Sequence, residues 1–143
     1  MNVHLIKLAV GVEDFDHLAH LQQQRMAAYV AQGLSANPRH VTRMKPKREA
    51  EVLNGGSIYW VIKGAIRARQ ELLAFESYSD DEGVKRCVMI LSPKLVATQN
   101  RPHRAFQGWR YLDPAKAPPD VGSTPNGDMP LELARDLEEL GLL

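Results

Sequence analysis

The alternation of side chains between Ser57 and Lys63 constrains the fold of this chain more than any other feature. β-branched and aromatic residues dominate the segment, which begins after Gly56 and ends before Gly64. Its side chains fall on two faces, one with Ile58, Trp60 and Ile62 and the other with Tyr59, Val61 and Lys63. A period of two over this length predicts a strand, with Trp60 in the core between two isoleucines.

The two segments that follow extend this strand into a sheet. Val84 to Leu91 is a short apolar run stopped by Ser92-Pro93 and predicts a buried strand. Ala65 to Glu76 is ambiguous, because Ala, Arg, Gln, Glu and Leu also have high helix propensity. We interpret it as a strand, since a single Gly64 is a tight connection for a strand-to-helix reversal. On a strand, Arg67 and Arg69 lie on one face, opposite Ile66, Ala68 and Leu72.

The remaining elements flank the sheet. The pattern predicts a strand at Val3 to Val10, a helix from Asp14 to about Gln32, an exposed loop at Ser35 to Met44 and a short helix from Pro46 to Leu53. It also predicts an irregular strap over residues 113–128 and a C-terminal helix over residues 129–140. Together these patterns predict a single α+β domain over residues 1–143, with a small mixed or antiparallel sheet and flanking helices.

Composition excludes several classes of protein. A chain of 143 residues with 44% hydrophobic and 24% charged residues is typical of one globular core, and no apolar run approaches the length of a membrane span. The lone Cys87 and the lack of a signal-peptide pattern favour a cytoplasmic location. We expect no metal and no cofactor, because His17 and His20 form a helix pair without a third strong ligand nearby.

Charge is segregated along the chain although the net charge is only +1. Residues 33–70 hold eight Lys and Arg against two acidic residues, and residues 85–116 hold seven against one. Cations mixed with aromatic rings suit nucleic acids, because cations neutralise phosphates and rings stack on unpaired bases. The predicted ligand-binding residues are Arg67, Arg69, Arg104, Trp109, Arg110 and Tyr111. The alternative is structural. Phe106, Trp109 and Leu112 would hold a loop against the sheet, with its arginines solvated or paired with the acidic C-terminal helix. Arg67 and Arg69 would form surface ion pairs with Glu71 and Glu76.

Three stretches resemble a family of bacterial proteins described only as a domain of unknown function. They are Gly56 to Gly64, Lys85-Arg86-Cys87, and Arg101 to Leu112 with its Phe106-Gln107-Gly108-Trp109-Arg110-Tyr111 core. The order of elements is also similar to PUA-like barrels, the group that includes the ASCH and EVE domains. That resemblance implies a small β-barrel that binds RNA or modified bases, although the Gly-x-Lys-x-x-Glu-x-Arg pattern of ASCH proteins is absent.

Three functions remain open at this point. The first is a PUA-like binding module for RNA or a nucleotide-like ligand, held by the basic and aromatic residues named above. The second, implied by the resemblance to ASCH domains, is a small amidohydrolase or nucleoside-processing enzyme that uses Lys63 and a nearby Glu; it requires both groups in one concave pocket. The third is a protein-interaction subunit, which requires a contiguous exposed apolar patch.

Overall fold

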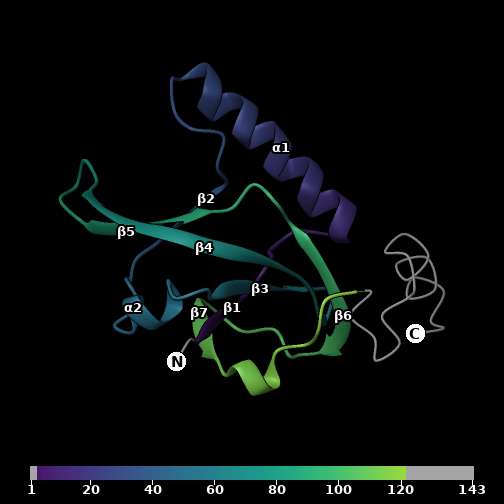
Figure 1. The fold of residues 1–143 in the computed structure, drawn as a ribbon. Helices are drawn as coiled ribbons and strands as arrows, with labels where there is room; N and C mark the ends of the chain where they lie inside the picture. Colours follow the sequence, from purple (N-terminus) through teal and green to yellow (C-terminus); the bar gives the residue numbers. More distant parts are fainter. Residues whose placement is uncertain (1–2, 122–143) are drawn as a thin grey trace.

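The computed structural model describes residues 3–121. These residues form an α+β fold in which one mixed sheet is flanked by helices (Figure 1). The strands are β1 (His4–Leu8), β2 (Arg39–Thr42), β3 (Ser57–Ile62), β4 (Ala65–Ser79), β5 (Lys85–Leu91), β6 (Val96–Pro102) and β7 (Trp109–Leu112). The helices are α1 (Phe15–Ala31), α2 (Glu49–Val52) and the 3-10 helix η1 (Pro114–Lys116).

The long strand β4 organises the sheet. Its first half pairs with β3 on one edge and with β6 on the other, and its second half pairs with β5. β2 extends the sheet beyond β5, while β1 and β7 extend it beyond β3. The sheet is mixed because β1 and β3 are parallel and the other pairs are antiparallel. The described strands do not close into a barrel, which differs from the barrel implied by the resemblance to PUA-like proteins.

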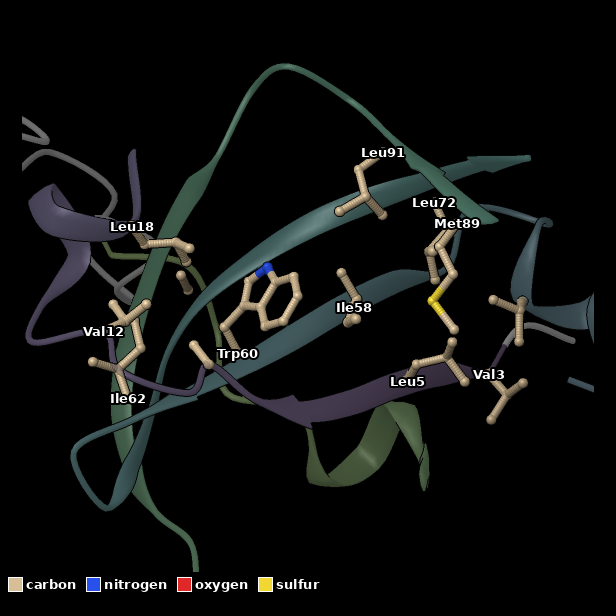
Figure 2. Close-up of a cluster of buried hydrophobic side chains, with 13 residues drawn as sticks. Val3, Leu5, Val12, Leu18, Ile58, Trp60, Ile62, Leu72, Met89 and Leu91 are labelled. Atoms are coloured by element: carbon tan, nitrogen blue, oxygen red, sulfur yellow. The ribbon is translucent and has the colours of Figure 1, made fainter. Parts of the chain in front are cut away.

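Each face of the sheet carries its own apolar cluster. Ile58, Trp60 and Ile62 of β3 pack with Leu18 of α1 and Val52 of α2 on one face, which we call the helix face (Figure 2). Tyr59 and Val61 pack on the other face with Ile6, Leu112 and Ala117, where the η1 segment covers them; we call it the strap face. Figure 1 shows α1 and η1 on opposite sides of the sheet. Strand β3 is therefore buried throughout, as a strand covered on both faces must be.

Most of the elements expected from sequence patterns are confirmed. Residues 65–79 form a strand and not a helix, and α1 begins at the expected cap, where the Asp14 carboxylate accepts a hydrogen bond from the His17 amide at 2.8 Å. The turn between β3 and β4 uses Lys63 and Gly64, both with positive φ, which is the geometry of a two-residue hairpin.

Two expectations for β3 and β4 were wrong in detail. Lys63 was expected to end the strand but lies in the turn, because its φ is positive. Ile66 was expected on one face with Ala68 and Leu72, but the register shift at Arg67 places it in the strap-face cluster while the other two lie in the helix-face cluster.

Two expectations for the flanking elements were also wrong in detail. Ser35 to Met44 was expected to be a loop, but its middle forms β2, whose hydrogen-bonding partner β5 lies about fifty residues later. The short helix begins at Glu49 and not near Pro46. The strap expected over residues 113–128 is described only to Val121, where it includes η1, and the helix expected over residues 129–140 lies outside the described residues. Among the residues described, no helix is both long and apolar enough to span a membrane.

Candidate functional site

The structure places the two arginines of β4 in internal contacts. Arg69 donates two hydrogen bonds to the Asp120 carboxylate, at 2.6 and 2.7 Å, and a third to the Ser57 hydroxyl at 3.0 Å. Arg67 lies where the register between β3 and β4 shifts, and its Nε donates to the Ile62 carbonyl at 2.6 Å. Arg69 therefore holds the strap and Arg67 stabilises the β3–β4 turn. Both roles are structural, but Arg69 pairs with Asp120 and not with the expected Glu71 or Glu76.

The aromatic and basic residues of β7 point to opposite faces of the sheet. Trp109 and Tyr111 alternate with Arg110, and their rings meet edge to face with centroids 5.2 Å apart. On the helix face, Trp109 donates its indole N–H to the Met44 carbonyl, and the Tyr111 hydroxyl accepts a hydrogen bond from the Arg48 amide. Arg110 lies over the ring of Phe106, 4.7 Å from its centroid. The predicted residues of β7 therefore do not all lie on one face of the sheet.

A cleft of about 450 Å³ lies beside β7 and contains part of the predicted set. Arg110 and Tyr111 line it, together with His103, Arg48 at the N-cap of α2 and Lys116 at the end of η1. The full lining is Val3, Ile6, Arg48, His103, Arg110, Tyr111, Leu112, Asp113, Pro114 and Lys116. Its volume lies in the usual range for small-molecule pockets, about 300–1,000 Å³. Arg104 follows His103 in the loop between β6 and β7; it is exposed but does not line the cleft.

The cleft is positively charged. Arg48 forms an ion pair with Glu51 at 2.6 Å, and hydrogen bonding to that carboxylate raises the pKa of Arg48. Asp113 uses its carboxylate to accept the Ala115 amide at the start of η1. Arg110 and Lys116 form no ion pair within residues 3–121. Two cations in the cleft are therefore available to an anionic ligand.

The pair required by the enzyme hypothesis lies on the surface. The Lys63 ammonium is 3.0 Å from the Glu13 carboxylate, but the two side chains are 57% and 66% exposed. Neither residue lines the cleft beside β7 or the second pocket described below. A solvated ion pair at a hairpin turn lacks the concave surroundings that general acid–base chemistry requires.

A second, smaller pocket of about 90 Å³ lies on the helix face between α1, β2 and β3. His40 of β2 contacts Trp60 of β3 edge to face, with ring centroids 5.9 Å apart. The lining is otherwise mostly apolar, with Gln22 and two arginines as its remaining polar residues: Ala9, Val10, Val12, Leu18, Leu21, Gln22, Arg25, Pro38, Arg39, His40, Trp60 and Leu91. In Figure 2, Trp60 lies among Val12, Leu18 and Ile62 at this end of the core.

The imidazole of His40 is the most perturbed group in this pocket. Burial lowers its pKa to about 4, and the positive charges of Lys7 and Arg25 act in the same direction. Its Nε2 atom is buried without a hydrogen-bond partner among the described residues. Sequence patterns missed His40 because it falls in a polar, basic stretch without periodicity, and only pairing with Met89 of β5 turns its side chain toward the core.

Lowering the pH from about 7 to about 4.5 is expected to destabilise the protein through His40. The unfolded imidazole takes up a proton near the ordinary histidine pKa of 6.5, whereas the folded one does so only at a pKa of about 4. The contribution to stability is therefore full above pH 6.5 and is lost as the pH falls toward 4, by about 2 kcal/mol. Urea unfolding of His40→Phe should show a flatter pH profile than the parent, while His20→Phe, on exposed helix surface, should keep the parent's slope.

Metal binding and thiol chemistry have little support in the described part of the chain. No cluster of three His, Cys, Asp or Glu side chains suited to a metal occurs within residues 3–121. Cys87 is buried, and burial raises the pKa of its thiol, so it is a poor nucleophile.

Several large apolar side chains are exposed, as a protein-interaction surface would require. Among them are Val41 of β2 and Leu73 and Tyr78 of β4, on the two strands that flank β5.

Comparison with known proteins assigns a family without an activity. The family model described as "Protein of unknown function (DUF1489)" matches residues 5–143. No curated protein and no solved structure matches the chain.

Proposed function

Since this chain belongs to the DUF1489 family, whose description names no activity, we propose from the geometry that it binds a nucleotide-like ligand or a short stretch of RNA in the cleft beside β7. The observation that carries the proposal is the convergence of Arg110 and Lys116, neither paired with a described carboxylate, on a cleft of about 450 Å³. Tyr111, the next residue of β7, also lines the cleft and is 37% exposed.

The arrangement of the cleft suits a phosphate-bearing ligand. Phosphate groups are bound through several hydrogen bonds from cations, and guanidinium groups present two parallel donors for this purpose. Arg48 lies over the Tyr111 ring, 5.4 Å from its centroid, so one aromatic wall of the cleft is held in place by α2. A phosphate near Arg110 and Lys116 would lie in a cleft that Tyr111 and His103 also line.

The double variant Arg110→Ala/Lys116→Ala tests this site. The parent protein is expected to bind a fluorescent single-stranded oligonucleotide or a nucleoside monophosphate at low salt, with affinity that falls as salt rises. Removing two phosphate contacts should weaken binding of either probe at least tenfold and reduce the salt slope by about two for RNA. Fluorescence anisotropy against salt measures both quantities, and thermal unfolding checks that the variant is folded.

The matched control is Lys85→Ala/Lys94→Ala, which removes the same charge from exposed positions that do not line the cleft. It should retain the parent's affinity apart from a small uniform loss. Equal weakening by both double variants would mean that only net charge matters and would refute a site at the cleft. Binding of the monophosphate alone identifies a small-ligand site, and binding of the oligonucleotide alone identifies RNA.

A further inference from the structure

The pocket between α1, β2 and β3 is separate from the cleft beside β7, with which it shares no lining residue. It combines a mostly apolar wall with a small number of polar groups, which is the usual composition of a small-molecule site. Val12, Leu18 and Leu21 supply aliphatic surface, and Trp60 supplies an aromatic wall that is only 6% exposed.

Most polar groups of this pocket already have partners. The Gln22 amide exchanges two hydrogen bonds of 2.8 Å with Gln70. Arg39 donates to the carbonyls of Ser35 and Asn37, and its guanidinium lies over the Tyr29 ring. The His40 Nε2 atom and the Arg25 guanidinium remain without a hydrogen bond or ion pair to another described residue.

Leaving the His40 nitrogen buried and unpaired is unfavourable, because a buried polar atom without a partner loses its hydrogen bonds to water. The neutral imidazole carries one N–H. With the proton on Nε2, it can donate to a ligand once a small shift of the neighbouring side chains uncovers this buried atom in the pocket wall. An apolar ligand would leave this group unpaired, so the ligand requires a hydrogen-bonding atom at that end.

The charges around His40 indicate whether the hydrogen-bonding group of the ligand is negatively or positively charged. Arg25 of α1 and Arg39 of β2 line the pocket, and the charge of Lys7 on β1 also acts on the imidazole. Lys7 is partly buried, forms no ion pair with a described residue, and has a pKa lowered by that burial. The pocket lining contains no acidic residue. A bound anion would be attracted by these unbalanced positive charges, whereas a cation would be repelled.

We propose that this pocket binds a small organic carboxylate with a compact, branched aliphatic body. The carboxylate accepts a hydrogen bond from His40 Nε2 and pairs with Arg25 at the exposed rim, and the apolar body lies against Trp60 and Leu18. The volume of about 90 Å³ restricts the ligand to this size and excludes a whole nucleotide.

The probes for the test are isobutyrate and isovalerate, compared with their uncharged amides and with isobutylamine. We expect at least one of the two carboxylates to bind with a Kd of about 1 mM or tighter, followed by the His40 and Trp60 side-chain signals in NMR titrations. The matching amide should bind at least tenfold more weakly, and isobutylamine should not bind. Failure of both carboxylates to bind, or equal binding of carboxylate and amide, would overturn the proposal.

The variant His40→Phe keeps a ring against Trp60 and removes the hydrogen-bonding nitrogen. It should weaken carboxylate binding roughly ten- to a hundredfold, the range expected for a hydrogen bond to a charged group. His20→Phe, on exposed helix surface, should bind as the parent does. Unaltered binding by a folded His40→Phe protein would place the carboxylate elsewhere.

A pH series gives an independent readout. A bound carboxylate favours the protonated imidazole, so the His40 pKa should rise on binding, and affinity should increase as the pH falls from about 7 to about 5. Arg110→Ala/Lys116→Ala should leave carboxylate binding unchanged, so failure of either proposed site can be recognised without the other. A pH-independent affinity with no shift of the His40 signals would contradict the assigned contact.

Discussion

Replacing Gln70 by leucine is expected to destabilise the protein by about 3–5 kcal/mol, because this side chain holds together a buried polar network. Gln70 is fully buried and uses all of its amide atoms. Its oxygen accepts hydrogen bonds from Gln22 and from the Trp60 indole, at 2.8 and 3.3 Å. Its nitrogen donates to Gln22 and to the Ser92 carbonyl, both at 2.8 Å.

The loss is larger than for a single hydrogen bond because leucine leaves three partners unpaired in the core. Urea unfolding at neutral pH measures the effect, and the matched comparison is the double variant Gln22→Leu/Gln70→Leu. The double variant should recover part of the stability, because the Gln22 amide no longer remains buried without a partner. Additive losses from Gln22→Leu and Gln70→Leu would show that the two amides do not interact in solution.

The network also bears on the pocket of the carboxylate proposal. Gln22 lines that pocket, and its bond to Gln70 fixes the side of α1 that faces His40 and Trp60. Helix α1 has two buried residues, Leu18 and Gln22, and Phe15 and Leu21 also pack against the core. A ligand in the pocket would therefore rest against a wall that the Gln22–Gln70 pair helps to position.

Gly56→Ala is expected to reduce stability by about 3 kcal/mol, through a steric clash at the start of β3. A Cβ atom built on Gly56 lies 2.2 Å from the Val52 carbonyl oxygen and 2.5 Å from the Val3 carbonyl oxygen. Both neighbours are backbone atoms. The start of β3 would therefore have to move away from α2 and from Val3, the residue before β1. The Gly56 amide also donates to the Val52 carbonyl at 2.9 Å, and that hydrogen bond would be strained.

The neighbouring Gly55 is the control for this substitution. It has a φ of +79° and no atom within 4 Å of an added Cβ, so Gly55→Ala should cost only about 1–2 kcal/mol, from backbone strain. Chemical denaturation of both variants separates the two effects. A Gly56→Ala protein no less stable than the Gly55→Ala protein would mean that the contact with Val52 is loose in solution.

Sequence patterns predicted much of the sheet correctly but little of the candidate sites. The alternation in β3 placed Ile58, Trp60 and Ile62 on one buried face, as observed. Arg110 and Tyr111 were predicted as ligand-binding residues, and both line the cleft beside β7, but Arg48 and Lys116 of the same cleft were not among the six predicted residues. They reach it from α2 and η1, and their positions relative to β7 depend on how those segments return to the sheet.

Elements formed by residues close together in the sequence could therefore be predicted from the sequence alone. The Asp14 cap, the β3 alternation and the connection at Gly64 involve residues at most a few positions apart, and their conformations follow from sterics and neighbouring hydrogen bonds. The tertiary structure decided the rest. The Gln22–Gln70 pair spans 48 positions and the Arg69–Asp120 pair spans 51, and His40 becomes buried only when β2 pairs with β5. These side chains acquire their partners from packing between distant segments, and packing has no periodic signature in the sequence.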